Sequence, residues 1–442
     1  MRLQEVERIP WVPFVGAHAG ELLGLTATDY LKSADRMVEG VNKAIELYNP
    51  DGIPVAFDLQ IEAEALGCQL AWADDNPPAV VSHPLMEGLS IEEMNVPCPC
   101  KGRIPMVMDA TRRLRDQHPD LALYGLITGP FTLALHLMGT DIFMQMMMDP
   151  EQIHKVMRFA TDVAKMMAGN YMESGADVIA IVDPMTSQID PMSFETFVSP
   201  YVREINDFIR EADALSSFFV CGNARQNIEV MCQTKPDNIS IDENIPLDFV
   251  RDIALKHQVS FGGNMKLTVV LLMGDEEASR REALECMDIG GKKGFILAPG
   301  CDLAMATPKE NLVAVAELVH DEILQGELRA SEARSENIQP LDLSNHWNQE
   351  KVVIDIITLD SSSCAPCQYM VDAVARASEV FGEQVVYKEH SIKEKEGVQM
   401  MATLGVHNIP TVVMDGHIEF ISQIPPIQAI KDKISGYLAA KN

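Results

Sequence analysis

The chain has 442 residues, enough for two or three domains, and 47% of them are hydrophobic, enough to bury a large core. It carries 35 basic and 65 acidic residues, a net charge of −30; such a surface repels phosphate backbones, so we expect no nucleic-acid partner. No window approaches 18 uninterrupted apolar residues, and the N-terminus lacks the apolar segment of a secretion signal. We therefore expect no membrane span and a cytoplasmic location.

The chain contains nine cysteines, an odd number without framework spacing. In a large chain without a secretion signal, this favours reduced thiols, metal sites or redox chemistry over structural disulfides. Cys98 and Cys100 form a close pair, but no second pair or nearby His completes a metal site, so we interpret them as loop residues. Cys68, Cys232 and Cys286 lie in apolar helical contexts and are predicted to be buried in the core.

Short apolar runs, each leading to a polar or thiol residue, alternate with helical segments along the first 320 or so residues. They are Trp11–Ala17, Ile53–Phe57, Leu121–Ile127, Val178–Val182, Ser216–Val220, Ile239–Ile241, Val259–Gly262 and Phe295–Ala298. Eight strand–helix units predict an α/β fold of the (β/α)8 TIM barrel type, in which the active site lies at the carboxyl ends of the strands.

Two of these ends carry a thiol. Cys221 follows the fifth run and Cys301 follows the eighth, so we expect both sulfurs to meet at the mouth of the barrel as one soft-metal or thiol site. The other polar side chains at strand ends are His18, Asp58, Asp183, Asp242 and Asn264. For Asp183 and Asn264, two roles stay open: binding of substrate, or hydrogen bonding within the rim.

Residues 138–172 are rich in Met. Methionine side chains adapt to a flat cofactor or a partner protein, but at helical spacing they also fill ordinary cores. We favour the core, and keep a docking surface as the alternative.

From Gly326 to Glu350 the sequence is polar and loses its periodicity, which predicts a linker between a barrel at 1–325 and a second domain at 351–442. The second domain begins with an apolar strand at Val352–Leu359, followed by a helix that opens at Cys364. Its further elements complete the order β-α-β-α-β-β-α, which predicts a thioredoxin-like α/β fold.

Cys364 and Cys367 form a Cys-x-x-Cys motif at a predicted helix start, where the helix dipole favours a thiolate and the second thiol can resolve a mixed disulfide. With Ile409-Pro410-Thr411, this motif resembles the thioredoxin superfamily over about 90 residues. The resemblance implies that Cys364 is the nucleophile, Cys367 the resolving thiol, and Pro410 a cis-proline facing them. Ser363 replaces the aromatic residue that often precedes the first Cys, so the redox partner is left open.

The barrel segments PFVGAHAG, AFDLQIEAEALGC, GLITGPFTLA, FFVCGNA and ILAPGC follow one another as in a known family. Over residues 5–325 the chain resembles the uroporphyrinogen decarboxylase superfamily, and within it the cobalamin-dependent methyltransferases, including the methylcobalamin:coenzyme M type. The decarboxylases carry an Arg-rich motif after the first strand, whereas GAHAGELLGL contains no Arg. Porphyrinogen decarboxylation is therefore disfavoured, although Asp58 falls near the decarboxylases' substrate-facing Asp.

The methyltransferase branch binds zinc through a His-x-Cys motif after the fifth strand and a Cys after the eighth. Cys221 and Cys301 match the two thiols, but Phe219 stands at the His position. The resemblance thus implies a zinc site with Cys221, Cys301 and a third ligand, which we expect to be His18. A carboxylate such as Asp58, Asp183 or Asp242 is an alternative third ligand. Two further alternatives stay open: His18 as a hydrogen-bonded His without metal, and the two thiols as a redox pair serviced by the C-terminal dithiol.

These expectations combine into a corrinoid-dependent methyltransferase with an appended dithiol redox domain. Methylcobalamin or another corrinoid would come from a partner protein, because the chain shows no cobalamin-binding His motif. Cys221, Cys301, His18 and Asp58 are the predicted catalytic residues, and Asp183, Asn264 and Asp242 the predicted contacts to a small-molecule methyl acceptor or donor. The main rival is a thiol–disulfide redox protein without methyl transfer, and an idle scaffold is a third reading. A homodimeric state is left open.

Overall fold

The computed structural model describes residues 1–330, 341, 343, 346–347, 350–361, 364–406 and 408–441. They form two compact units, Met1–Glu332 and Ala333–Asn442, which we describe separately. Helix α15 (Glu322–Arg329) runs through Gly326, where we expected the linker to begin, and buries Leu328. Most of the predicted linker beyond Ala330 lies outside the described residues.

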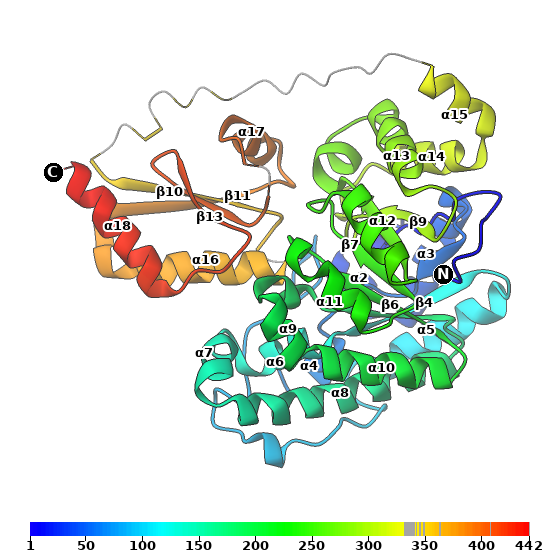
Figure 1. Cartoon of the computed structure of the whole chain (residues 1–442), viewed down its shortest axis with the longest axis horizontal. Helices are drawn as coiled ribbons and strands as arrows, with labels where there is room; N and C mark the ends of the chain where they lie inside the picture. Colours follow the sequence, from blue (N-terminus) through cyan, green and yellow to red (C-terminus); the bar gives the residue numbers. More distant parts are fainter. Residues whose placement is uncertain are drawn as a thin grey trace. The chain divides into compact units, whose positions relative to one another are not determined.

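The first unit is built on a curled parallel sheet of seven strands, in the order β1-β4-β5-β6-β7-β8-β9 (Figure 1). The strands are β1 (Gly52–Pro54), β4 (Ala122–Thr128), β5 (Val178–Val182), β6 (Leu215–Val220), β7 (Asn238–Ile241), β8 (Ser260–Met265) and β9 (Phe295–Pro299). Each overlaps one of the predicted apolar runs, so this α/β barrel-like architecture is confirmed. A separate hairpin, β2 (Leu70–Ala71) with β3 (Ala79–Val80), lies in the long connection after β1.

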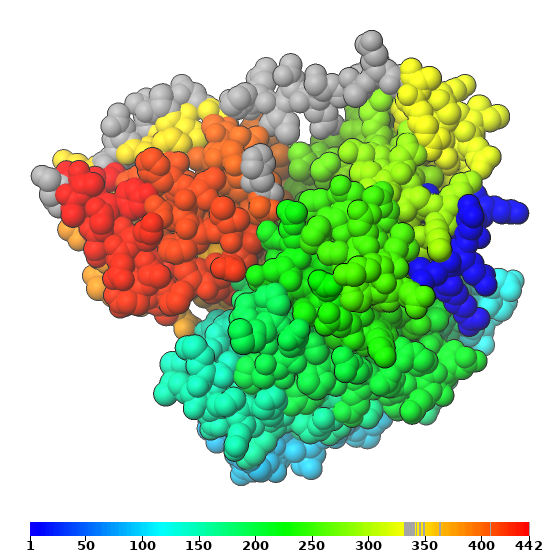
Figure 2. Space-filling view, in the orientation of Figure 1, coloured from blue at the N-terminus to red at the C-terminus, as the bar shows by residue number. Residues whose placement is uncertain are grey.

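Helices cover the outside of this sheet (Figure 1), and the face drawn in the space-filling view is formed largely by residues of the second half of the first unit, coloured green (Figure 2). Up to β5 they are α1 (His18–Glu21), α2 (Ala27–Tyr30), α3 (Ala34–Tyr48), α4 (Ile61–Ala65), α5 (Ile104–Gln117), α6 (Pro130–Met138), α7 (Asp141–Met148) and α8 (Pro150–Glu173). After β5 they are α9 (Pro191–Phe197), α10 (Ser199–Glu211), α11 (Ile228–Gln233), α12 (Leu247–Lys256), α13 (Glu276–Gly290) and α14 (Lys309–His320). Short 3-10 or π turns lie at η1 (Ile91–Glu93), η2 (Pro184–Gln188), η3 (Arg225–Asn227) and η4 (Leu267–Leu272).

The first predicted strand, Trp11–Ala17, was wrong as a full strand. Trp11 makes a single parallel bridge to Leu297 of β9, and the chain turns into helix α1 at His18. Val12 N still donates to Leu297 O, and Asp51 N donates to Trp11 O, so this segment hydrogen-bonds both edges of the sheet. Pro10 and Pro13 flank Trp11 and lack N–H donors, which explains why a continuous strand ladder does not form.

The interior of the barrel is apolar, because alternate residues along each strand point to the same side. Its core cluster includes Phe14, Phe57, Leu126, Val182, Phe219 and Ala298. Cys221 and Cys301 pack against this cluster from the carboxyl ends of β6 and β9. The fold therefore places both thiols on the inner side, at the end of the barrel where the sequence predicts the active site.

The Met-rich stretch divides between the two predicted roles. Met157 and Met167 on α8 are fully buried and belong to the core. On α7, by contrast, Met147 and Met148 are 82% and 72% exposed. Core packing therefore explains Met157 and Met167, and also Met146 on α7, but not the exposed Met147 and Met148.

The second unit has a four-stranded mixed sheet in the order β11-β10-β12-β13, with β10 parallel to β11 and antiparallel to β12. Its elements are β10 (Val352–Thr358), α16 (Ala365–Ser378), η5 (Glu379–Gln384), β11 (Val385–Ser391), α17 (Lys395–Thr403), β12 (Thr411–Met414), β13 (His417–Ile421) and α18 (Ile427–Lys441). Val352, Ile354 and Ile356 pack under α16 and α18, and Figure 1 shows α17 on the opposite face of the sheet. This element order is the one that the sequence predicts.

No helix within the described ranges is long and apolar enough to cross a membrane.

Candidate functional site

Two thiols form the centre of the candidate site. The Sγ atoms of Cys221 and Cys301 lie 2.7 Å apart, and both residues are partly exposed. Cys221 follows the last residue of β6, two positions after Phe219, so its side chain continues the inward-facing side of that strand. Cys301 follows β9 after the turn at Gly300. The predicted meeting of the two sulfurs is therefore present.

The loops that carry the thiols are held by neighbouring strand ends. Asp242, directly after β7, accepts a hydrogen bond of 3.0 Å from the backbone N–H of Gly222, next to Cys221. Gly300 donates to the carbonyl of Met265 at 3.0 Å. A Cβ at Gly300 would lie 2.7 Å from the backbone nitrogen of Glu243, so only glycine allows this close approach. Asp242 thus acts on the Cys221 loop, a role that its position in the sequence did not reveal.

The buried Asp242 and its partly buried neighbour Glu243 form an acid pair near the loop of Cys221. Burial raises the pKa of the Asp242 carboxyl. Burial and the charge of Asp242 raise the pKa of Glu243 to about 8. Both shifts disfavour a doubly ionised pair, so near neutral pH this pair retains a proton close to the thiol loops.

Three phenyl rings lie beneath the thiols. The ring centroids of Phe14 and Phe219 are 5.3 Å apart, and those of Phe57 and Phe219 are 5.9 Å apart with the rings edge to face. Phe219 is only 1% exposed. The position that the family resemblance assigns to a zinc-binding His is therefore filled by an aromatic ring packed into the barrel interior.

His18 is buried and has partners at both ring nitrogens. Its Nδ1 lies 3.0 Å from the carbonyl oxygen of Met305, and its Nε2 lies 2.7 Å from the hydroxyl of Tyr48. Burial lowers the pKa of His18 to about 4, and the bond to Met305 opposes this shift only in part. This geometry agrees with the alternative prediction of a hydrogen-bonded His18 without metal. Both ring nitrogens that could bind a metal already have hydrogen-bond partners.

A zinc ion that activates a thiol needs three protein ligands and one open position. Within the described part of the chain, no three His, Cys, Asp or Glu side chains converge on a place that could hold a metal ion. Cys221 and Cys301 supply two ligands, and neither Phe219 nor His18 supplies the third. The residues present do not fit the predicted zinc site.

Asp58 belongs to a buried ion cluster that the sequence reading missed. Its carboxylate pairs with the guanidinium of Arg103, whose Nε also binds Glu64 at 2.6 Å. Arg103 immediately precedes α5, 45 residues after Asp58, and no pattern in the sequence links the two. This Arg is neutralised by two carboxylates, so it differs from the free cation that would grip a substrate carboxylate.

The side chains of Asp183 and Asn264 form hydrogen bonds to backbone groups of the barrel. The Asp183 carboxylate accepts from the backbone N–H groups of Phe131 and Thr132 at 3.1 and 2.7 Å, and so caps α6. Gly129 makes room for it, because a Cβ there would lie 2.2 Å from the Asp183 side chain. Asn264 donates to the carbonyls of Ile245 and Asp242 at 2.7 and 3.3 Å. Both geometries agree with the rim hydrogen-bonding role, while a role in substrate binding stays a prediction.

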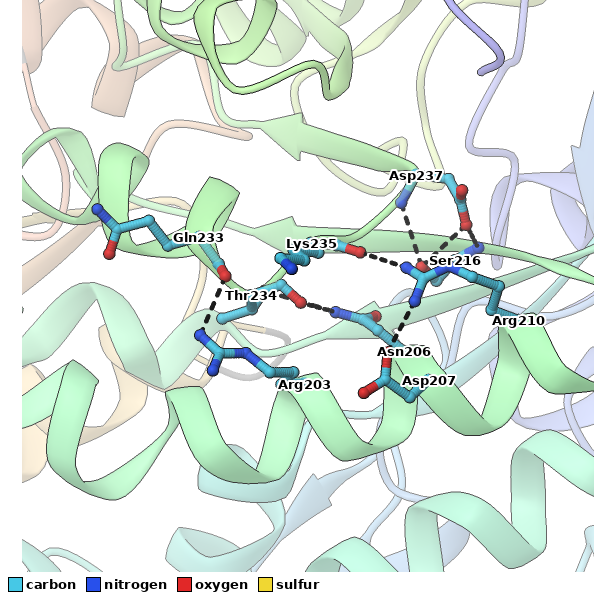
Figure 3. A network of polar contacts seen from close by, with 9 residues as sticks. All are labelled: Arg203, Asn206, Asp207, Arg210, Ser216, Gln233, Thr234, Lys235 and Asp237. Atoms are coloured by element: carbon cyan, nitrogen blue, oxygen red, sulfur yellow. Dashed lines mark hydrogen bonds and ion pairs between the residues drawn. The ribbon is translucent and has the colours of Figure 1, made fainter.

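The opposite end of the strands carries a network of structural polar contacts (Figure 3). Arg210 on α10 donates to the carbonyl of Lys235 at 2.6 Å, and Asn206 donates to the carbonyl of Thr234 at 3.1 Å. Asp237 accepts from the backbone of Ser216 at the start of β6 at 2.9 Å. In barrels of this type the amino ends of strands contribute stability rather than chemistry, so the network is not a second site.

The other cysteine pairs fall in different settings. Cys98 and Cys100, expected to be free loop residues, are joined by a disulfide. In the second unit, Cys364 is the partly exposed N-cap residue of α16, and Cys367 is fully buried one turn later. The Ile409–Pro410 peptide bond is cis. The exposed and buried thiols of this pair have the arrangement that a nucleophile and a resolving thiol require.

A family model described as "Uroporphyrinogen decarboxylase (URO-D)" matches residues 1–322. The relative "Methylcobamide:CoM methyltransferase MtbA" of Methanosarcina acetivorans is 26% identical over 324 residues, which cover 72% of this chain and 94% of that protein. A "Uroporphyrinogen decarboxylase" of an Anaeromyxobacter species is 24% identical over 340 residues, covering 72% of this chain and 96% of that protein.

Among solved structures, a "methyltransferase from Methanosarcina mazei" is similar with a TM-score of 0.66 and 24% identity, covering 72% of this chain and 94% of that chain. At this identity the similarity concerns the fold alone. The family match ends at residue 322, so it does not extend into the second unit.

Proposed function

The chain belongs to the uroporphyrinogen decarboxylase family, and we propose that within it the barrel is a corrinoid-dependent methyltransferase. It would move a methyl group between a corrinoid carried by a partner protein and a small-molecule acceptor. The observation that carries this proposal is the pair of partly exposed thiols, Cys221 and Cys301, at the carboxyl end of the barrel. The relative named as a methylcobamide:CoM methyltransferase, which the chain matches along 94% of that protein's length, supports the same reaction class.

The residues around the thiols suit methyl transfer to a soft nucleophile. The bound corrinoid would supply an electrophilic methyl group at the barrel mouth. Cys221 and Cys301 would contact a thiol acceptor such as coenzyme M, and the apolar layer around Phe219 would keep water away from the reacting methyl group. Asp242 would position the Cys221 loop through its bond to Gly222. A zinc ion has no part in this proposal, because the described residues provide only two of its ligands.

Decarboxylation of a porphyrinogen, the reaction after which the family is named, is less well supported for this chain than methyl transfer. A porphyrinogen substrate with several carboxylates needs free cations, and residues 16–25 contain no Arg. Arg103, which does reach Asp58, is held by Asp58 and Glu64 together. The site therefore lacks an unneutralised guanidinium beside Asp58.

For the second unit we propose a thioredoxin-like dithiol domain. Cys364 at the start of α16, the buried Cys367 and the cis bond before Pro410 support this proposal. A helix N-terminus favours the thiolate form, which is the nucleophile in thiol–disulfide exchange. The chain would then carry a dithiol in its second unit in addition to the thiols of the barrel.

An anaerobic assay tests the barrel's activity. The full chain is mixed with methylcobalamin as donor and either 2-mercaptoethanesulfonate or 2-mercaptoethanol as acceptor, and the methylated thiol is measured by mass spectrometry. We expect methylated product, and at least about a tenfold lower rate in a Cys221→Ser/Cys301→Ser variant. Cys364→Ser, outside the barrel, is the matched control and should retain the rate. Absence of methylated thiol together with carbon dioxide release from uroporphyrinogen would replace the methyltransferase by the decarboxylase.

A further inference from the structure

We infer that Cys221 and Cys301 form a reversible dithiol–disulfide couple at the mouth of the barrel, which exchanges electrons with a second dithiol. This redox activity of the barrel thiols goes beyond the proposed methyl transfer. The couple itself does not rest on the proposed function; only an effect of its redox state on the rate of methyl transfer would.

The first support is the contact between the sulfurs. The two Sγ atoms lie 2.7 Å apart with both side chains partly exposed, whereas Cys68, Cys232 and Cys286 are free but buried. Bond formation between two sulfurs already in contact needs little movement of the backbone. Partial exposure lets a soluble disulfide reach one of them.

The second support is that the surroundings fit a thiol pair better than a metal site. Phe219, at the position that the family resemblance gives to a metal-binding His, packs against Phe14, and no three potential ligands converge within the described residues. Two adjacent thiols without a third ligand side chain near them are open to oxidation. The bonds from Gly222 to Asp242 and from Gly300 to Met265 fix each thiol-bearing loop to a neighbouring strand end.

The third support is the dithiol that the same chain carries. Cys364 is partly exposed and Cys367 is buried, so attack by one sulfur and resolution by the other can be separated. A tethered dithiol has an effective concentration of about millimolar when its linker spans the gap. The chain therefore contains an exchange partner of the right chemical class.

The exchange balances without a further reagent. Starting from a Cys221–Cys301 disulfide, the Cys364 thiolate attacks one of its sulfurs, and a mixed disulfide forms while the other barrel sulfur leaves as a thiolate. The Cys367 sulfur then attacks Cys364, which releases the second barrel thiolate. Two electrons pass from the Cys364/Cys367 dithiol to the barrel pair. The two released barrel thiolates take up two protons through water, which replace the one that Cys364 lost on ionising and the one that Cys367 loses on attack. The reverse sequence oxidises the barrel pair.

The test uses the wild-type full chain, equilibrated anaerobically in buffers of increasing ratio of glutathione disulfide to glutathione. The free thiols are then blocked with N-ethylmaleimide, and the digested protein is examined by mass spectrometry. We expect a peptide pair linked through Cys221 and Cys301, which becomes the major form at oxidising ratios and disappears after dithiothreitol. If N-ethylmaleimide labels both Cys221 and Cys301 at every glutathione ratio that oxidises Cys364 and Cys367 to a disulfide, the proposal of a Cys221–Cys301 couple is wrong.

A Cys367→Ser variant tests the exchange partner. Without the resolving thiol, we expect oxidised protein to accumulate a mixed disulfide between Cys364 and either Cys221 or Cys301. Cys364→Ser is the matched control and should accumulate none. If Cys367→Ser forms no such bond while the barrel disulfide is still reduced by glutathione, the exchange with the second dithiol is wrong. These readouts do not depend on turnover, so a failure of the methyl transfer assay leaves them intact.

Discussion

The Sγ atoms of Cys221 and Cys301 are in contact at 2.7 Å, although 80 residues separate the two cysteines. Their strands are not neighbours, because β7 and β8 lie between β6 and β9 in the sheet. The sulfurs meet because the sheet curls and both side chains pack on the same inner cluster. A pair of thiols packed over a phenyl ring offers two metal ligands, whereas a zinc site of the predicted kind needs three.

We expect wild-type protein, purified without oxygen, to hold far less than one zinc ion per chain. Phe219→His would add a ligand on the inner side of β6, two residues from Cys221, and should raise zinc content towards one ion per chain. Elemental analysis after dialysis measures both. Stoichiometric zinc in the wild type would contradict the assignment of the thiols as a metal-free pair.

Phe57→His is the matched control for this change. It introduces the same side chain into the same aromatic cluster but not two residues before a thiol. We expect it to leave zinc content unchanged. Adding Cys301→Ser to Phe219→His should abolish the gain, because only two ligands would then remain.

Asp58→Asn is expected to destabilise the barrel. Arg103 has a side chain only 8% exposed and would keep Glu64 as its single charged partner. Removing the buried partner leaves the Arg103 charge compensated only by the more exposed Glu64, so we expect a loss of about 3 kcal/mol in the free energy of unfolding. Urea denaturation at neutral pH measures it.

The control is Asp109→Asn, which removes a surface partner of Arg113. Exposed pairs of this kind contribute about 0.5 kcal/mol or less. If the two variants unfold at the same urea concentration, the cluster around Asp58 does not stabilise the fold, and a purely catalytic role for Asp58 gains support.

His18 makes the barrel sensitive to acid. Its pKa is about 4 in the folded chain, against an ordinary value of 6.5, so between these values the unfolded state binds a proton that the folded state does not. Stability therefore falls as pH falls through this window, by about 2 kcal/mol between pH 7 and pH 5 from this group alone. His18→Gln, which does not titrate, should reduce the loss, as measured by urea unfolding at both pH values.

The His118→Gln variant serves as a control, because it leaves the bonds of His18 to Tyr48 and Met305 in place. It should retain the wild-type loss between pH 7 and pH 5. An unchanged acid sensitivity in His18→Gln would show that other buried groups set the pH dependence.

The second unit should need residues before the predicted boundary at 351. Asp355 is fully buried and accepts hydrogen bonds from Trp347 at 3.1 Å and from His346 and His390 at 2.9 and 2.8 Å. Leu341 also donates to Thr403. A fragment of residues 341–442 should therefore be more stable than one of residues 351–442, by about 2 kcal/mol for the partners that Asp355 loses.

Chemical unfolding of the two fragments, followed by circular dichroism, measures this difference. A 341–442 fragment with Trp347→Phe is the intermediate control, since it removes one donor and keeps the aromatic ring. Equal stability of the long and short fragments would place the boundary at 351 after all. Limited proteolysis of the full chain should cut between residues 330 and 341, and earlier cuts within the barrel would contradict the division into two units.

Local patterns in the sequence were enough to predict most of the elements. Seven of the eight apolar runs contain a strand, and the element order of the second unit follows the predicted one. Strand periodicity, prolines at helix starts and the Cys-x-x-Cys spacing each involve only a few neighbouring residues, so they can be recognised without knowledge of the fold. The run from Trp11 failed because Pro13 removes a donor within it and Pro10 removes another just before it.

Only part of the candidate site could be predicted from the sequence, because its contacts join residues far apart in the chain. The position of the two thiols after β6 and β9 followed from the barrel pattern, and Phe219 marked the absence of the family's His. Only the tertiary structure decided that His18 is bonded to Tyr48 and Met305, and that Arg103 neutralises Asp58. Hydrogen bonds and burial fix these roles, and both depend on which distant side chains the folded chain brings within about 3 Å of each other.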